Sequence, residues 1–382
     1  MPSIFTFDIS NSRRSFVNLE SFRPLGASGL LVSPLALGTM TFGTPRWGMD
    51  ADASRGVFDR YIGLGGNFID TADVYSGGAS EEMVGRFVEE SGLRDRLVIA
   101  TKSGFNTGEG FHQGGNGARH IHAAVDRSLK RLRTDFIDLY WIHIWDGITP
   151  AAEMLRTMSN LIAAGKIRYW GLSNSPAWYA AEIATLARAH MLPAPVGLQY
   201  FYSLVERGVE DEHLPLAKAL GMGLVPWSPL AYGLLTGKYD RATVEAGPVR
   251  QGGVPNAGGA AGARAEGDGR LDGDNPFGDT LFTDRNWRIV DAVKRVAADM
   301  GETAARVALA WVVGRAGVAA TLMGVSRAEQ ITDNVAALDL VLAGEHLAAL
   351  DAVSAEGGKF LYGLFKPEVR NQIVFGGGHV TA

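Results

Sequence analysis

The sequence predicts an α/β fold, a (β/α)₈ TIM barrel with an N-terminal β-hairpin and a long loop after its seventh strand. Short apolar runs alternate repeatedly with amphipathic stretches, which is typical of βαβ units and a parallel sheet. No Gly-x-Gly-x-x-Gly opens a helix after any of the apolar runs, so an open dinucleotide-binding sheet is disfavoured. A length of 382 residues also suits one large barrel.

Eight runs have the nearly continuous apolar character of parallel strands that are buried on both faces. They occupy residues 35–40, 67–70, 97–102, 137–143, 167–173, 196–200, 223–227 and 319–323. Helical stretches lie between them at 51–64, 80–90, 119–133, 151–165, 176–190, 211–221 and 303–314. Gly165, Gly221 and Gly314 stand where three of these helices should end.

The barrel is expected to span residues 21–353, after an N-terminal extension at 1–20 and before a C-terminal tail at 354–382. The segment FRPLGASGLLVSPL indicates a hairpin turning at Ala27, Ser28 and Gly29, which we expect to plug the bottom of the barrel. Residues 241–280 are rich in Gly and Ala and lack periodicity, which predicts either a lid or a disordered loop.

Composition excludes several classes of function. The formal net charge of -5 disfavours nucleic acid as a partner, because phosphate binding needs a basic surface. There is no cysteine, so disulfides, cysteine zinc sites and thiol nucleophiles are excluded. His120 and His122 lie two apart on an expected helix and face different sides, so no metal site is expected.

No apolar run approaches the roughly 18 residues needed to cross a bilayer. Arg13 and Arg14 are similar to a twin-arginine export signal, but no apolar stretch follows them. We therefore expect a solvated extension and a cytoplasmic protein.

Functional groups of a barrel gather where its strands end. The second, third and fourth runs lead into Asp70, Lys102 and His143, and Tyr75 follows the second. These residues suit carbonyl reduction, since hydride addition builds negative charge on an oxygen that a tyrosine hydroxyl can protonate. A lysine would stabilise the phenolate, a carboxylate would hold the lysine, and a histidine would orient the oxygen. Alternatively, Asp70 and Lys102 only join two strands and Tyr75 only caps a loop.

The later strand ends are also polar or aromatic. They lead into Ser173 and Asn174, then Gln199, then Trp227 and Ser228, and finally Ser326 and Arg327. Ser173 and Asn174 could also cap the helix at Pro176, and Trp227 could be ordinary core. Three further aromatic residues either line a substrate pocket or only pack: Trp47, Trp145 and Tyr232.

Seven motifs in this order and spacing resemble the aldo-keto reductase superfamily, in particular its bacterial branch similar to potassium-channel β subunits. The likeness covers roughly residues 21 to 353. The motifs are FRPLGASGLLVSPLALGTMTFG, NFIDTADVYSGGASEEMVGR, VIATK, DFIDLYWIHIWD, GKIRYWGLSNSPAW, VPWSPLAYGLLTGKY and GVSRAEQITDNVAAL.

The resemblance implies the same catalytic tetrad, Asp70, Tyr75, Lys102 and His143. It also implies a nicotinamide cofactor. The carboxamide would be held by Ser173, Asn174 and Gln199, the ring would stack on Trp227, and the pyrophosphate would be lined by Ser228, Leu230 and Gly233. The adenosine end would be held by Ser326, Arg327, Gln330 and Asn334. Arg327 suits a 2′-phosphate, so NADPH/NADP is expected ahead of NADH.

The function expected from the resemblance is NADPH-dependent, reversible hydride transfer to an aldehyde or ketone, with the alcohol as substrate in reverse. The alternative is a cofactor-binding regulatory subunit similar to channel β subunits, because these share the same residues. Loops 41–50, 104–118 and 145–149 and the C-terminal tail would set the small-molecule substrate, which the sequence does not name. The sequence also leaves the oligomeric state open.

Overall fold

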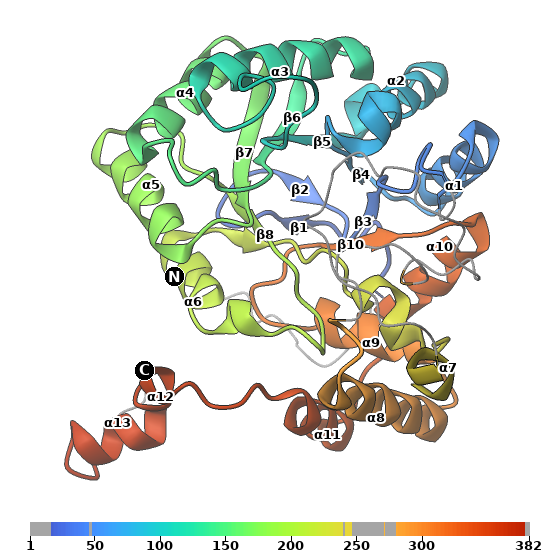
Figure 1. Cartoon of the computed structure of the whole chain (residues 1–382), viewed down its shortest axis with the longest axis vertical. Helices are drawn as coiled ribbons and strands as arrows, with labels where there is room; N and C mark the ends of the chain where they lie inside the picture. The colour runs from blue at the N-terminus through green and yellow to red at the C-terminus, as the bar shows by residue number, and fades with distance from the viewer. Residues whose placement is uncertain (1–16, 46–47, 240, 247–270, 272–279, 379–382) are drawn as a thin grey trace, which may run out of the picture.

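A computed structural model describes residues 17–45, 48–239, 241–246, 271 and 280–378. Its central feature is a parallel sheet in the order β10-β3-β4-β5-β6-β7-β8-β9 that curls round, with helices on its outside (Figure 1). A parallel bridge joins Leu224 to Val318, and the Leu322 amide donates to the Pro226 carbonyl at 2.8 Å. These bonds join the two ends of the sheet, and the predicted (β/α)₈ barrel is confirmed.

All eight predicted strands are present, several of them shorter than expected. They are β3 (Leu35–Gly38), β4 (Phe68–Asp70), β5 (Val98–Ser103), β6 (Ile137–Ile142), β7 (Ile167–Ser173), β8 (Gly197–Gln199), β9 (Gly223–Leu224) and β10 (Thr321–Gly324). Alternate residues of each strand point into the barrel, because side chains along a strand alternate between its two faces. Trp141 fills much of the interior, and Gly171 and Gly197 leave room for it, since a Cβ on Gly171 would lie 2.3 Å from its ring.

The helices predicted between the strands are also present, within two residues at each end. They are α1 (Ala51–Gly63), α2 (Ala79–Ser91), α3 (Ala118–Leu132), α4 (Ala151–Ala163), α5 (Ala177–Ala189), α6 (His213–Leu220) and α9 (Ala304–Val313). The sequence pattern did not predict α8 (Asp284–Met300) or α11 (Gly344–Ser354). For α10 (Ala328–Val335) it predicted only where the helix begins. α8 and α11 pack on each other and neither directly follows a strand, so the alternation of strands and helices did not predict them.

The predicted N-terminal hairpin is formed by β1 (Arg23–Pro24) and β2 (Leu31–Val32). It closes the end of the barrel at which the strands begin. Gly26, at φ +60°, lies so close to the chain before β8 and β9 that an added Cβ would be 2.4 Å from the Gly221 carbonyl oxygen. Leu25 is fully buried in the interior core with Trp141, so the hairpin plugs this end as expected.

Range 241–280 begins with a short helix, α7 (Arg241–Ala246), which corrects the expectation of a loop without any regular structure. Most of the rest, and with it the choice between lid and disordered loop, lies outside the described residues, as does the Arg13–Arg14 pair. Within the expected extension, Leu19 is fully buried. The C-terminal tail contains α12 (Phe360–Gly363) and α13 (Pro367–Ile373). No helix in the described ranges is long and apolar enough to span a membrane.

Candidate active site

The two-residue period of the strands brings three predicted residues together at the mouth, the end of the barrel where the strands finish. Asp70 lies two residues beyond Phe68, Lys102 two beyond Ala100 and His143 two beyond Trp141, and these apolar residues belong to the interior core. Asp70, Lys102 and His143 are therefore the first polar layer above that core. All three are buried.

Lys102 is the centre of this layer. Its ammonium forms an ion pair with Asp70 Oδ1, donates to the Thr71 carbonyl oxygen at 2.8 Å and lies 3.5 Å from the Tyr75 hydroxyl oxygen. Gln199 Nε2 donates to the second carboxylate oxygen of Asp70 at 3.0 Å. Burial lowers the pKa of Lys102, but the charges of Asp70 and Tyr75 outweigh it and leave that pKa above its ordinary value. The side chain therefore stays cationic.

His143 faces Tyr75 across the mouth. The two rings meet edge to face with centroids 5.9 Å apart, and Phe105 packs against the other side of the imidazole at 4.4 Å. Burial and the charge of Lys102 hold the pKa of His143 well below its ordinary value, so the ring is neutral. Its buried Nδ1 atom has no hydrogen-bond partner among the described residues. A neutral imidazole that faces the Tyr75 ring can position a substrate oxygen.

The turn that carries Tyr75 is held from outside the barrel. Ser76 and Gly77, inside the 3₁₀ helix Tyr75–Gly78, have left-handed φ angles of 51° and 64°. Arg131 of α3 packs on Gly78 and donates to Glu81 at 2.6 Å, and Glu81 accepts from Thr101 at 2.6 Å. Glu81 is fully buried, so this bridge fixes the turn against the strand that carries Lys102. Sequence reasoning missed both Glu81 and Arg131.

Asp73 lies in the same turn and is almost completely buried, and neither of its carboxylate oxygens has a partner among the described residues. Burial, with the negative charge of Glu81, raises the pKa of Asp73 to about 8, against partial opposition from Arg131 and Arg127. Asp73 is therefore protonated at neutral pH.

This assignment predicts how stability depends on pH. Between about pH 4 and 8 the folded chain keeps the Asp73 proton and the unfolded chain releases it, so the wild type should lose stability as pH rises. Asp73→Asn removes that loss. As pH increases, the free energy of unfolding of this variant should rise relative to that of the wild type, by up to about 1.4 kcal/mol per pH unit. Urea unfolding across this range measures the difference. Asp95→Asn, at an exposed position, is the control, and parallel curves for wild type and Asp73→Asn would contradict the assignment.

Ser173, Asn174 and Gln199 lie side by side at the ends of β7 and β8, where Ser173 pairs in register with Gln199. Ser173 Oγ donates to the Gln199 carbonyl at 2.7 Å, and Asn174 Nδ2 donates to the His143 carbonyl at 2.9 Å. The capping alternative is wrong: the residue that caps α5 is Pro176, and no side chain accepts a bond there. Asn174, at φ 46°, is a non-glycine residue in the left-handed region, which is frequent at functional sites.

Trp227 is half-buried at the mouth, and its Nε1 donates to Asn174 Oδ1 at 3.3 Å. Phe201, which sequence reasoning missed, stacks on one face of the indole with centroids 4.9 Å apart, and Tyr232 meets it edge to face at 6.4 Å. Trp227 therefore packs against the interior core and also forms an aromatic wall with Phe201 and Tyr232.

The chain after Trp227 bends tightly round the mouth. Ser228, Tyr232 and Gly233 all have left-handed φ angles, of 50°, 57° and 92°. Leu230 is half-buried between them. The Lys238 ammonium reaches back to this bend, 3.4 Å from the place that a Cβ on Gly233 would occupy. Lys238 adds a positive charge that sequence reasoning did not single out.

The predicted adenosine residues lie on one side of α10. The Arg327 side chain is exposed and makes no hydrogen bond or ion pair within the described ranges, whereas Asn334 is buried. Gln330 Oε1 accepts from the Ser326 amide at 2.8 Å. At 100° per residue, Arg327, Gln330 and Asn334 share one helix face.

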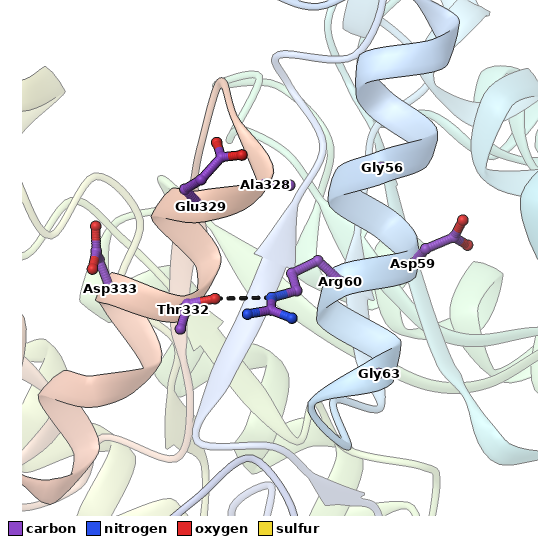
Figure 2. A pocket seen from close by; sticks show the side chains of 8 residues that line it. All are labelled: Gly56, Asp59, Arg60, Gly63, Ala328, Glu329, Thr332 and Asp333. Carbon is purple, nitrogen blue, oxygen red and sulfur yellow. Dashed lines mark hydrogen bonds between the residues drawn. The ribbon is translucent and has the colours of Figure 1, made fainter.

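The opposite face of α10 lines a groove of about 720 Å³ against α1, where Arg60 Nε donates to Thr332 Oγ1 at 2.9 Å (Figure 2). The groove lies on the outer wall of the barrel, between two helices. It is therefore separate from the strand ends and from the tetrad.

The three residues expected to contact substrate differ in where they lie. Trp47 lies outside the described residues. Trp145 is half-buried two residues after His143, and its ring meets Trp178 edge to face at 5.6 Å. Tyr232 lies in the aromatic wall with Trp227. The structure thus places Trp145 and Tyr232 at the mouth.

The mouth of this parallel barrel holds a buried Lys–Asp pair, a tyrosine and a neutral histidine. Such a set of groups at the strand ends is typical of barrel enzymes. The family model described as Aldo/keto reductase family matches residues 34–355. The chain belongs to the aldo/keto reductase family, and the resemblance seen in the sequence is confirmed.

Some relatives of this chain are named as potassium channel subunits, and others are named as reductases or dehydrogenases. It is 32% identical to "Probable voltage-gated potassium channel subunit beta" of Oryza sativa over 84% of this chain and 92% of the relative. It is 30% identical to "Norsolorinic acid reductase" of Aspergillus flavus, over 85% and 78%, and 30% identical to "Aryl-alcohol dehydrogenase [NADP(+)]" of Phanerodontia chrysosporium, over 88% and 86%. The family and the latter two relatives support an oxidoreductase.

Proposed function

We propose that the protein is an NADPH-dependent reductase of aldehydes or ketones that also oxidises the corresponding alcohols. The observation that carries this proposal is the position of the Lys102 ammonium, buried between the Asp70 carboxylate and the Tyr75 hydroxyl. A fixed cation beside a phenol favours the phenolate, so the hydroxyl can release and regain a proton. Asp70, held by Gln199, keeps the cation in place.

The proton chemistry assigns a role to each side chain. Tyr75 gives its proton to the carbonyl oxygen as negative charge develops there, and takes a proton from the alcohol in reverse. His143, which is neutral and faces Tyr75, orients that oxygen opposite Tyr75. Phe105, Trp145 and Trp227 give the opening an aromatic lining that suits a carbonyl attached to an apolar group.

The residues along the mouth fit a dinucleotide. Ser173, Asn174 and Gln199 would hold the nicotinamide carboxamide, and Trp227, with one face on Phe201, would stack on the ring. Ser228, Leu230 and Gly233, with Lys238 nearby, would surround the pyrophosphate. Ser326, Arg327, Gln330 and Asn334 would hold the adenosine end. When bound, the nicotinamide supplies or accepts the hydride.

The exposed Arg327 gives a direct test of the choice of cofactor. Arg327→Ala should weaken NADPH binding more than tenfold, because a charge-assisted bond to phosphate contributes about 1.5–3 kcal/mol. The affinity for NADH should change by no more than about twofold, since NADH lacks the 2′-phosphate. Fluorescence titration with both cofactors measures this. Arg60→Ala is the control, because Arg60 lies on α1 and contacts the face of α10 that points away from the predicted adenosine residues (Figure 2). Equal losses for both cofactors would make Arg327 structural.

A cofactor-binding regulatory subunit is the second candidate, because the Oryza sativa relative is named a potassium channel subunit beta. The two functions differ in turnover. We expect steady NADPH oxidation with members of a panel of aldehydes and ketones, at a rate proportional to the amount of enzyme. Cofactor binding without turnover of any carbonyl or alcohol in the panel would favour the regulatory subunit.

A further inference from the structure

The C-terminal tail carries large apolar side chains that nothing in the described chain covers. An extended segment leads from α11 to α12 and α13, which lie outside the ring of barrel helices (Figure 1). More than half of the surface of each of five apolar side chains is exposed: Phe360, Leu361, Phe365, Ile373 and Val374. A bare apolar surface of this kind on a folded chain marks an interaction site.

The start of the tail is fixed in place. The Lys359 ammonium pairs with Asp211 at 2.5 Å, and the Tyr362 hydroxyl donates to Glu212 at 2.5 Å. Asp211 and Glu212 come between β8 and α6, on the side where the strands end. The tail therefore leaves from the rim of the mouth, and Figure 1 shows it running outward rather than across the opening.

A second apolar surface lies on the same rim, and its exposed part consists of Ile148 and Trp178, because Tyr179 is buried. We call it the aromatic rim and define it as Trp145, Ile148, Trp178 and Tyr179, whose three aromatic rings pack on one another at 5.6–6.1 Å. The aromatic rim borders the candidate active site, because the Trp145 amide donates to the Asn174 carbonyl at 3.3 Å.

The charges of the two surfaces are complementary. Burial and the carboxylates of Asp146, Glu182 and Glu153 raise the pKa of Tyr179, so three negative charges lie near the aromatic rim. Beyond Lys359, the tail carries two cations, Lys366 and Arg370, and a single acid, Glu368. Opposite charges at the edge of an apolar contact fix its orientation.

We propose that two copies of this chain form a two-fold dimer in which the tail of each copy packs on the aromatic rim of the other. The described residues of a single copy cover neither surface. A reciprocal exchange covers both surfaces of both copies at once, as a two-fold interface requires. Each opening is then bordered by apolar side chains of the other chain. Only this last consequence rests on the proposed function.

Cross-linking tests the dimer directly, because the chain has no cysteine of its own. Trp178→Cys and Phe365→Cys are made in separate full-length chains, mixed, and treated with a short bis-maleimide. We expect a covalent dimer from the mixture and little from either chain alone. Val341→Cys, at an exposed apolar position outside both surfaces, replaces Phe365→Cys in the control mixture. In a chain with both substitutions, a link confined to one chain would overturn the exchange and indicate a tail that folds over its own rim.

The mass in solution gives an independent test. By light scattering, the wild type should have twice the mass of one chain, and Phe360→Ser/Phe365→Ser/Ile373→Ser should have the mass of one chain. The circular dichroism spectrum of this variant should match the wild type, which shows that each chain remains folded. Val341→Ser should remain dimeric. A monomeric wild type, or a dimer that survives the triple substitution, would overturn the proposal. Neither result depends on turnover, so a failure here is distinguishable from a failure of the proposed function.

Discussion

Tyr75→Phe is expected to lower turnover by a factor of about 10²–10⁴, since that is the usual contribution of a positioned proton donor. The phenylalanine keeps the ring against His143 and removes only the hydroxyl beside Lys102. The affinity for NADPH should stay within about twofold, because other strand ends are proposed to hold the cofactor. Steady-state kinetics and fluorescence titration on the same preparation measure both quantities.

Tyr200→Phe is the matched control. It also removes a buried hydroxyl near the end of a strand, but this hydroxyl donates to the Ser175 carbonyl at 2.7 Å. We expect that variant to retain turnover with a modest loss of stability. If Tyr75→Phe retained wild-type turnover, the role assigned to Tyr75 would be wrong.

Lys102→Met should abolish turnover and also destabilise the fold by about 3–5 kcal/mol, the usual cost of leaving one partner of a buried ion pair. The Asp70 carboxylate would keep its bond from Gln199 but would lose the charge that compensates for burial. Chemical unfolding and turnover measurements report the two losses separately.

The double variant Asp70→Asn/Lys102→Met separates stability from chemistry. Removing both charges should recover more than half of the lost stability, because no unpaired charge remains buried. Turnover should stay absent, since no cation is left beside Tyr75. A double variant no more stable than Lys102→Met would show that the loss comes from packing rather than from charge.

The alternation of apolar strands with helices made the barrel predictable from sequence, and the polar residues at the strand ends made the tetrad predictable. Asp70, Lys102 and His143 each follow an interior residue by two positions, and the registry of β4, β5 and β6 then brings them together. The structure also shows contacts that the two-residue period of the strands does not predict. Gln199 was expected to hold a cofactor, and it also binds Asp70, from a position 129 residues further along the chain.

Local patterns could not reveal groups that become buried only through distant partners. Glu81 lies in an acidic first turn of a helix, where exposure is usual, and it is buried because Arg131 reaches it from α3. Asp73 has no apolar periodicity to mark it as interior. Phe105 and Phe201 follow strands β5 and β8, in loops where an aromatic residue carries no signal of its own.

The most direct test of the central proposal is isotope transfer. Wild-type protein is incubated with an aldehyde panel and NADPH deuterated at the transferable position of the nicotinamide, and the alcohols are analysed by mass spectrometry. We predict deuterium on the former carbonyl carbon, with many molecules of product per protein chain and almost none from Tyr75→Phe. Tight binding of NADPH without deuterated product from any aldehyde or ketone would contradict the account.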